Sequence, residues 1–525
     1  MPCRPGASLP LNTRRSPLAG GADVSVEGLT WRPARRRAAV FRDLDLFVPA
    51  GQRVLVAGPS GAGKSSLLRA IAGVLLTASH GDLSGRVRLG GRGEAASTPD
   101  GNRPGRVGML LQDPSTSIVA STVGRDVAFG LENMQVPRDQ IWSRVEQALR
   151  ETGFEYPLDH PTAALSGGEM QRLALAGSLA MHNEVTLLDE PTSMLDEAGA
   201  QRVRQAVQRD VENRGSTLIV VEHRLEPWLD FADRLVVLNR EGAIAADGVP
   251  RAVLRDHGQA LAAQGVWVPG IGTPASPRPP GHLVTPHVRY SGDLVSANRV
   301  GVEFRTRRQG ARRSASTTSA LAAISTTVSA GQALAVTGAS GAGKSTLVSV
   351  LAGLLRPSSG EVLAAQQLAA GSERRPWRWS SRDLAERISW VPQTPEHGVV
   401  AATVDAELAA AGAACRREPQ ELQHRADGLL ASLGLAHLRD ASPYHLSGGE
   451  QRRLMVAAAL VHGPAGVLLD EPTLGQDRLT WAAVMGVLAA SREAGTALAF
   501  ASHDHLAIPA LADAELRLER RADTS

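Results

Sequence analysis

The stretch Gly58-Pro-Ser-Gly-Ala-Gly-Lys-Ser65 decides the fold of this chain, and it recurs as Gly338-Ala-Ser-Gly-Ala-Gly-Lys-Ser345. Each copy follows a short apolar run, Val54-Leu-Val-Ala57 or Leu334-Ala-Val-Thr337, that is typical of a buried strand. A Gly-x4-Gly-Lys-Ser loop between a strand and a helix wraps phosphate oxygens with backbone N–H groups at the positive end of the helix dipole. The sequence therefore predicts two phosphate-binding loops, each in an α/β domain with a parallel sheet.

The two lysines of these loops, Lys64 and Lys344, are the only lysines among the 56 basic residues of the chain, and all the others are arginine. A compact ammonium group fits among phosphate oxygens, whereas a wide planar guanidinium would crowd the loop. Because lysine is kept only at these two positions, we interpret both loops as phosphate sites and not as simple glycine-rich turns.

Other motifs repeat in the same order. Leu165-Ser-Gly-Gly-Glu169 recurs 281 residues later as Leu446-Ser-Gly-Gly-Glu450, and Leu188-Asp-Glu-Pro191 recurs as Leu469-Asp-Glu-Pro472. Such matched landmarks indicate that one domain was duplicated. The predicted organisation is a disordered tail over 1–22, a first domain over 23–265, a Pro- and Gly-rich linker over 266–294 and a second domain over 295–525.

Composition limits the class of protein. The chain has 525 residues, of which 43% are hydrophobic, so it can form two cores, and its 56 basic and 53 acidic residues nearly cancel. This balance argues against a general nucleic-acid binder. The two cysteines, Cys3 and Cys415, are too far apart to indicate a disulfide framework. No run approaches the roughly 18 to 20 apolar residues of a membrane-spanning helix, and no signal peptide is recognisable at the start, so we expect a cytosolic protein.

Two consecutive carboxylates end a buried strand in each half, as Asp189-Glu190 and Asp470-Glu471. Ordinary strand-end charges explain one carboxylate but explain the matched repeat poorly. We expect the aspartates to support Mg²⁺ and the glutamates, Glu190 and Glu471, to polarise an attacking water as general bases.

With these motifs, the two Leu-Ser-Gly-Gly-Glu segments resemble the signature of ATP-binding cassette (ABC) proteins. The resemblance covers nearly the whole chain outside the tail and the linker. It implies two P-loop NTPase cassettes of the α/β class, each with a parallel-sheet core and a helical signature arm, that bind ATP and Mg²⁺ and hydrolyse ATP. In this family the signature acts in trans, so each nucleotide would lie between the phosphate loop of one half and the signature of the other.

The loops and the resemblance together give a set of expected site residues. The ATP-binding residues are Gly58, Pro59, Ser60, Gly61, Ala62, Gly63, Lys64, Ser65, Ser66, Gly338, Ala339, Ser340, Gly341, Ala342, Gly343, Lys344, Ser345, Thr346, Ser166, Gly167, Gly168, Ser447, Gly448 and Gly449. The catalytic residues are Glu190 and Glu471, the switch histidines His223 and His503, and the glutamine-loop residues Gln112 and Gln393. The Mg²⁺-supporting residues are Ser65, Gln112, Asp189, Ser345, Gln393 and Asp470.

Two further positions follow from the resemblance. Asp196 and Asp477 fall at the D-loop, where the second copy reads Leu-Gly-Gln before the aspartate and the first reads Ser-Met-Leu, so we expect the two sites to differ in rate. Trp31 and Phe304 are the nearest candidates for stacking on adenine, with core packing as the alternative.

The segment Asp113 to Gly130 after the first glutamine loop is similar to the ATPases of energy-coupling-factor importers, and Thr403-Val-Asp-Ala-Glu-Leu408 is a weaker version of it. In such importers this surface receives the coupling helices of a transmembrane subunit, and a separate membrane protein captures a vitamin or a metal ion. The resemblance thus implies a place on the cytoplasmic face of the membrane, with the cassettes paired within one chain or between two chains. Fused cassettes of this kind resemble those proposed for hydroxymethylpyrimidine or thiamine.

Several alternatives remain open on the sequence. An exporter ATPase of another ABC class has the same motifs. A soluble ABC translation factor resembles a pattern with a long charged linker, unlike 266–294, and the fused ATPase of a sugar importer often has one degraded half. The Arg-rich segments 35–37, 305–313 and 374–379 invite a nucleic-acid interpretation, but they are short and scattered, so we expect solvated loops and no specific nucleic acid.

Overall fold

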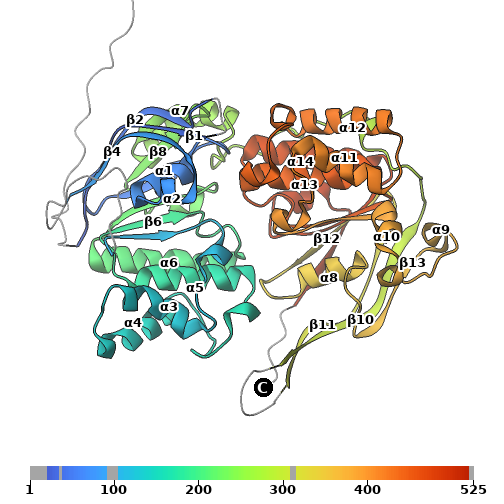
Figure 1. The fold of residues 1–525 in the computed structure, drawn as a ribbon, viewed down its shortest axis with the longest axis horizontal. Helices are drawn as coiled ribbons and strands as arrows, with labels where there is room; N and C mark the ends of the chain where they lie inside the picture. The colour runs from blue at the N-terminus through green and yellow to red at the C-terminus, as the bar shows by residue number, and fades with distance from the viewer. Residues whose placement is uncertain (1–19, 35–37, 91–104, 308–314, 520–525) are drawn as a thin grey trace, which may run out of the picture.

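The computed structural model describes residues 20–34, 38–90, 105–307 and 315–519, so most of the predicted tail lies outside the described residues. Two α/β halves of similar architecture stand side by side, the first running from β1 to α7 and the second from β10 to β17 (Figure 1). Each half has a sheet of parallel strands flanked by helices, and a helical arm. The predicted fold class is therefore confirmed.

The main sheet of the first half has the strand order β5-β6-β7-β3-β8-β9. Its strands are β3 (Arg53–Ala57), β5 (Val107–Leu110), β6 (Val185–Asp189), β7 (Thr217–Val221), β8 (Arg234–Leu238) and β9 (Ile244–Gly248). All neighbours are parallel except β8 and β9. Every residue of β6 and β7 is buried, as expected for parallel strands with helices on both faces of the sheet.

Seven helices surround this sheet or form the arm among the described residues of the first half. They are α1 (Lys64–Ala72), α2 (Leu75–Ala78), α3 (Val123–Asn133), α4 (Arg138–Glu151), α5 (Gly167–Ala180), α6 (Glu197–Arg214) and α7 (Pro250–Ala263). Helices α3, α4 and α5 share their own apolar cluster, in which Val123, Val127 and Leu131 recur at helical spacing. This separate core makes the arm a packed unit that can present the N-terminus of α5 at a fixed angle.

The second half repeats the plan with a five-stranded sheet in the order β14-β15-β16-β12-β17, in which all neighbours are parallel. Its strands are β12 (Ala333–Gly338), β14 (Ile388–Val391), β15 (Gly466–Asp470), β16 (Ala497–Ala501) and β17 (Ala514–Leu518). Its helices are α8 (Lys344–Leu351), α9 (Gln366–Ala369), α10 (Ser381–Arg387), α11 (Val404–Ala414), α12 (Pro419–Ser432), α13 (Gly448–Val461), α14 (Arg478–Glu493) and α15 (Ala507–Leu511).

An antiparallel three-stranded sheet, which the sequence patterns did not identify, completes each half. In the first half it has the order β2-β1-β4, with β1 (Val24–Pro33), β2 (Phe41–Val48) and β4 (Gly81–Leu89). In the second it has the order β11-β10-β13, with β10 (Asp293–Arg307), β11 (Ala315–Ser329) and β13 (Ser359–Ala364). Short 3-10 helices are η1 (Pro114–Ser117), η2 (Thr162–Ala164), η3 (Glu226–Trp228), η4 (Gly281–Leu283), η5 (Pro376–Arg378), η6 (Pro395–Gly398), η7 (Ala436–Leu438) and η8 (Pro443–His445).

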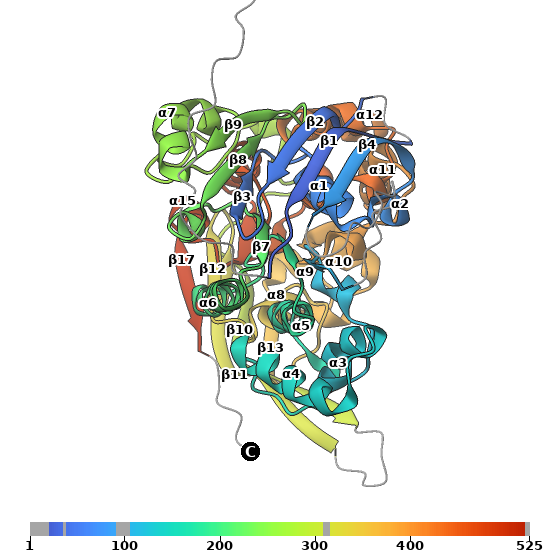
Figure 2. The same cartoon turned by 90° about the vertical axis from the view of Figure 1, so that its left-hand side faces the viewer.

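The two halves are arranged head to tail. In Figure 1, β1, β2 and β4 lie at the same end of the molecule as α11 and α12, while α3 and α4 lie at the same end as β10 and β11. Figure 2, turned by 90°, again separates the β1-β2-β4 sheet from α3 and α4 at opposite ends of the first half. Each phosphate loop can therefore face the helical arm of the opposite half.

The linker is docked on the protein surface, although its composition predicted only an extended segment. Val268 packs in the core of the first half, and Leu283 packs in the core of the second. Arg278 pairs with Glu493 at 2.7 Å, and the Trp267 Nε1–H donates to a backbone carbonyl of the second half at 3.1 Å. The apolar residues at both ends of the linker explain why it packs.

The Arg-rich segments are only partly described. Residues 35–37 and the side chains of 305–313 lie outside the described part of the chain. In 374–379, the guanidinium group of Arg378 lies 4.8 Å from the ring centroid of Trp377, and that of Arg387 lies 4.7 Å from the ring of Trp379. These contacts engage the tryptophans with arginines of the same half, as in a solvated structural loop.

Candidate active site

Each phosphate loop has the backbone that its glycines permit. Gly61 and Gly63 have φ angles of 81° and 88°, and Gly341 and Gly343 have 80° and 91°. These left-handed conformations favour glycine, and a Cβ atom at Gly63 would lie 2.5 Å from a valine side chain. Helices α1 and α8 begin directly after the loops, so their N-termini point into the loops as predicted.

Both lysines are buried and curl back onto their own loops. The Nζ of Lys64 donates to the carbonyls of Gly58 at 2.9 Å and Pro59 at 3.0 Å, and Lys344 repeats this arrangement. Burial lowers the pKa of both lysines, although nearby carboxylates, Glu190 first for Lys64, oppose the shift. An ammonium group has three N–H bonds, so one remains on each lysine for a phosphate oxygen.

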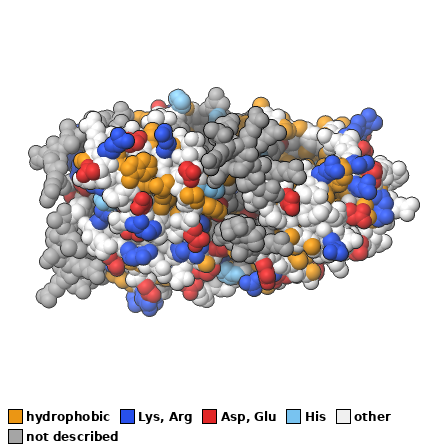
Figure 3. Space-filling view, turned by 90° about the horizontal axis from the view of Figure 1, so that it is seen from below, with side chains coloured by type: hydrophobic (Ala, Val, Ile, Leu, Met, Phe, Trp, Pro, Cys, Tyr) orange, Lys and Arg blue, Asp and Glu red, His pale blue; other side chains and the backbone are white. Residues whose placement is uncertain are grey.

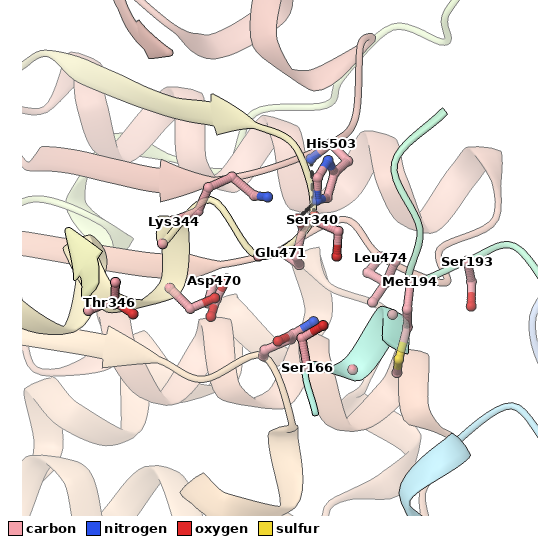
Figure 4. Close-up of a pocket in the computed structure, with 17 residues that line it drawn as sticks. Ser166, Ser193, Met194, Ser340, Lys344, Thr346, Asp470, Glu471, Leu474 and His503 are labelled. Carbon is pink, nitrogen blue, oxygen red and sulfur yellow. Dashed lines mark hydrogen bonds and ion pairs between the residues drawn. The ribbon is translucent and has the colours of Figure 1, made fainter. Parts of the chain in front are cut away.

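Two pockets, which we call site 1 and site 2, lie between the halves. Site 1 has a cavity volume of about 780 Å³ and site 2 one of about 210 Å³. The predicted residues that line site 1 are Ser60, Gly61, Gly63, Lys64, Ser65, Ser66, Gln112, Glu190 and His223 of the first half with Ser447, Gly448 and Gly449 of the second. Those that line site 2 are Ser340, Gly341, Gly343, Lys344, Ser345, Thr346, Gln393, Asp470, Glu471 and His503 of the second half with Ser166, Gly167 and Gly168 of the first (Figure 4).

Seven other predicted residues shape the sites without lining the pockets. Gly58, Pro59, Ala62, Gly338, Ala339 and Ala342 belong to the backbone of the loops, and Asp189 lies fully buried behind site 1. Trp31 is buried in the core and also borders site 1, whereas Phe304 is 45% exposed and does not line site 2.

The signature serines cap the helices that face the opposite loops. The Ser166 hydroxyl accepts from the backbone N–H of Glu169, whose side chain accepts in turn from the N–H of Ser166 at 2.8 Å, and Ser447 and Glu450 form the same capping box. A Cβ atom at Gly168 would lie 3.0 Å from the Ser340 hydroxyl. Glycine therefore suits this close approach between the helix start and the phosphate loop, because any side chain would force its neighbours to shift by a few tenths of an ångström.

The D-loop aspartates cross the interface. Asp477 accepts from the backbone N–H of Ser60 at 2.7 Å, and Asp196 accepts from that of Ser340 at 2.9 Å. Burial alone would raise the pKa of each carboxyl, but the backbone N–H donors lower it below the ordinary range. The sequence placed both aspartates at the D-loop but gave no signal for these contacts.

The two catalytic candidates sit in unequal electrostatic surroundings. In site 1 the Nε2 of His223 lies 3.0 Å from the Oε1 of Glu190. Burial alone would raise the pKa of Glu190, but the opposing effects of His223 and Lys64 are larger, so the pKa lies below its ordinary value. In site 2 the matching distance between His503 and Glu471 is 3.7 Å. Burial and the charge of Asp470 raise the pKa of Glu471 to about 7, and burial with Lys344 lowers the pKa of His503 to about 4.

Two buried charged residues were missed by the sequence reasoning. Arg452 on α13 donates to the backbone carbonyl of Gln393 at 2.7 Å; burial lowers its pKa to about 10, against the attraction of Glu471 and Glu190. The matched residue in the first half is neutral Gln171, and this mismatch inside the signature helices was the available signal. Glu222 precedes the first switch histidine, and burial raises its pKa to about 8.

The residues beside Asp189 fit a divalent cation. Among the described residues, no donor forms a well-shaped hydrogen bond with either carboxylate oxygen of Asp189, which are both buried, and the Ser65 hydroxyl, Arg69 and Lys64 favour the charged form. Burial and the charge of Glu190 raise the pKa of Asp189 to about 6. Because an unpaired buried carboxylate costs free energy, an oxygen-liganded cation such as Mg²⁺ would offset this cost.

Comparisons with known proteins agree with this geometry. A model of the ABC transporter family matches residues 41–193 and 321–474. A putative HMP/thiamine import ATP-binding protein of Bacillus subtilis is 31% identical over 511 residues, which cover 94% of this chain and 89% of that protein. A putative ABC transporter ATP-binding protein of Streptomyces coelicolor is 35% identical over 507 residues, covering 88% of this chain and 86% of that protein.

A solved structure resembles the whole two-half arrangement. The archaeal ribosome recycling factor, seen in complex with a ribosomal stalk protein, aligns over 93% of this chain and 87% of its own with a TM-score of 0.54 and 21% identity. At that identity the likeness concerns the fold alone.

Proposed function

This chain belongs to the ABC transporter family as an ATPase with two cassettes, and on that premise we propose that it powers the import of a vitamin precursor or a metal ion through separate membrane subunits. The import direction and the substrate class are supported by the importer-like segment after Gln112 and by the printed name of the Bacillus relative, an HMP/thiamine import protein. We propose 23–265 and 295–525 as the limits of the two cassettes.

The proposed roles follow from the two composite sites. The N–H groups and lysines of the loops hold the phosphates of ATP, and the signature serines with their glycines, Ser166 to Gly168 and Ser447 to Gly449, close on the phosphates from the opposite half. Glu190 and Glu471 act as general bases toward water, and the switch histidines, which lie beside them, orient these carboxylates.

Mg²⁺ would be held by one serine, one aspartate and one glutamine in each site. These residues are Ser65, Asp189 and Gln112 in site 1 and Ser345, Asp470 and Gln393 in site 2. When bound, the ion supplies charge neutralisation of the phosphate oxygens.

The observation that carries the transport assignment is a pair of exposed valines beside the glutamine loops. Val119 and Val400 occupy matched positions 281 residues apart and are 59% and 79% exposed. Each sits on a loop that a carboxylate holds through two backbone N–H groups, those of Val119 and Ala120 on Asp126 and those of Val400 and Ala401 on Glu407. A rigid loop that presents an apolar tip is suited to dock the helices of a membrane subunit.

The surroundings of these loops support docking. Within the described residues no helix is long and apolar enough to span a bilayer. Figure 3 views the end of the molecule that carries α3 and α4, the arm next to the Val119 loop, and apolar side chains gather there on the first half between charged ones; the α11–α12 arm next to Val400 lies at the opposite end (Figure 1). Phe129 and Met134 of this arm are exposed as well.

A pull-down from native membranes in mild detergent tests the proposal. The wild-type chain is expected to recover a small integral-membrane subunit, and the double variant Val119→Asp, Val400→Asp is expected to lose it while keeping its ATPase activity in detergent. Val249→Asp, at a similarly exposed valine in front of α7, is the matched control and should still recover the subunit. Recovery of ribosomes without membrane proteins would overturn the transport assignment and leave the ATPase in place.

A separate experiment tests the catalytic assignment. The double variant Glu190→Gln, Glu471→Gln should trap ATP in both sites and hydrolyse it at least a hundredfold more slowly, because Gln cannot accept the proton of the attacking water. Turnover at the wild-type rate would remove the role of these two carboxylates.

A further inference from the structure

The residues that directly follow the two switch histidines meet across the interface between the halves. The Nη2 of Arg224 donates to the Oδ1 of Asp504 at 2.7 Å, and its Nη1 lies 2.8 Å from the Nδ1 of His505. Arg224 and Asp504 are 280 residues apart, as are His223 and His503, so they occupy equivalent positions of the repeat. The contact therefore lies on the pseudo-twofold axis that relates the halves.

A contact between equivalent positions has a special consequence in a paired repeat. If the two halves were identical, this contact would join like residues, as at any symmetric interface. Two arginines or two aspartates at this distance would repel each other. Here the equivalent positions have opposite charges, so the contact is attractive only when a first half faces a second half.

The carboxylate of Asp504 is held in place from its own side. It is 11% exposed, and its Oδ2 accepts from the Thr473 hydroxyl at 2.8 Å and from the Trp481 Nε1–H at 2.7 Å. Arg224, in contrast, is 47% exposed, and among the described residues its guanidinium group makes no hydrogen bond within its own half. The second half thus provides a fixed acceptor, and the first half provides the cation that reaches it.

In the first half the equivalent threonine donates to a different carboxylate, one that does not stand at position 224. Thr192, the equivalent of Thr473, donates its hydroxyl to Glu222 at 2.6 Å, and Glu222 precedes the histidine. The position equivalent to Glu222 in the second half is Ser502. The carboxylate that accepts from the threonine therefore comes directly before the histidine in the first half, as Glu222, and directly after it in the second, as Asp504. This difference leaves position 224 to an arginine, which pairs with Asp504.

The start of the linker joins this cluster. The rings of Trp267 and Trp481 meet edge to face with centroids 5.7 Å apart, and the backbone of Trp267 forms an isolated β-bridge with that of Arg224. The Arg224–Asp504 pair thus joins the two switch-histidine loops. It also contacts Thr473, which follows the catalytic candidate Glu471, and the start of the linker at Trp267.

We propose that Arg224 and Asp504 form a pairing latch that selects the association of unlike halves and holds the two switch-histidine loops together when the halves close. The latch goes beyond the transport assignment, because it would act in the same way whichever substrate the membrane subunits carry. Each half recognises the opposite half of the protein through one guanidinium–carboxylate pair. Two copies of the same half would instead bring two arginines or two aspartates together at this position.

The test uses the full-length chain and measures the ATP concentration at which the halves close, by small-angle scattering in the Glu190→Gln, Glu471→Gln background. Arg224→Asp is expected to raise this concentration more than tenfold, because two carboxylates then face each other. Arg224→Gln and Asp504→Asn are each expected to raise it about threefold. The double variant Arg224→Gln, Asp504→Asn should be no worse than either single variant, since one shared interaction is lost.

Controls separate the latch from a general effect of charge or folding. Arg224→Lys should restore most of the wild-type behaviour, and added salt should weaken the wild-type advantage because Arg224 is half-exposed. Arg251→Asp, which reverses a charge paired with Asp230 inside the first half, should leave closure unchanged. Additive effects of the two neutral variants, or wild-type closure by Arg224→Asp, would overturn the proposal, and neither result would affect the docking of the membrane subunit at Val119 and Val400.

Discussion

Replacing Glu222 with glutamine is expected to stabilise the first half at neutral pH. Glu222 is buried, accepts from the hydroxyl and the N–H of Thr192 at 2.6 and 3.1 Å, and has a pKa that burial raises from 4.5 to about 8. Between these two pH values the folded protein keeps the proton that the unfolded chain has lost. Stability therefore falls as pH rises through this window, because the unfolded state binds fewer protons.

The magnitude follows from the two pKa values. At about 1.4 kcal/mol per pH unit, the penalty grows from near zero below pH 4.5 to about 3 kcal/mol at pH 7 and about 5 kcal/mol above pH 8. Glutamine keeps an oxygen that can accept from Thr192 and cannot ionise, so the penalty is absent in the variant. The two proteins should be about equally stable at pH 4.5, and the variant should be more stable by a few kcal/mol at pH 7.

Urea unfolding of the full-length chain at several pH values between 4.5 and 8 measures this difference. Glu212→Gln, at an exposed glutamate on α6, serves as the control and should follow the wild-type pH dependence. A stability difference between wild type and Glu222→Gln that does not change with pH would refute the reasoning, because it would mean that Glu222 ionises at the same pH in the folded and unfolded states.

Three further changes have expected outcomes. Arg452→Gln, which makes the second signature helix like the first at Gln171, should destabilise the second half by about 2 kcal/mol in urea and lower ATP turnover, because buried carboxylates lose a cation; an unchanged midpoint would contradict this. Leu283→Ala should cost about 2–5 kcal/mol by the same measurement, whereas Leu354→Ala at an exposed leucine should cost little, so equal costs would show that the linker is not docked. Gly63→Ala should abolish nucleotide binding to site 1 in equilibrium dialysis, since the backbone is left-handed there; tight binding would argue against this loop geometry.

The sequence predicted best those elements whose backbone conformation is determined by a short local motif. The loops before α1 and α8 and the capping serines Ser166 and Ser447 are specified locally, by glycine positions and by a serine three residues before a glutamate. The pairing of each loop with the opposite signature followed from the family resemblance, and the lining of sites 1 and 2 has that arrangement.

The features that the sequence did not predict depend on residues far apart in the chain. For example, the backbone N–H of Ser60 donates to Asp477, which lies 417 residues away in the chain. No periodic pattern in the sequence predicts such a contact. The antiparallel sheets pair segments that lie far apart in the chain, such as β1 with β4 and β10 with β13, so no local pattern identified them. The burial of Arg452 was hidden because an arginine on a helix is more often at the surface.

The docked linker sets how far the halves can separate. Val268 belongs to one core and Leu283 to the other, so only the 14 residues between them can straighten, and at about 3.3–3.6 Å per residue the 15 steps from Val268 to Leu283 reach about 50 Å. A tether of this length holds each half near the other at an effective concentration of about a millimolar. Closure after product release is therefore a unimolecular event, and we expect the turnover per chain to stay constant on dilution, whereas an enzyme assembled from free cassettes would lose activity.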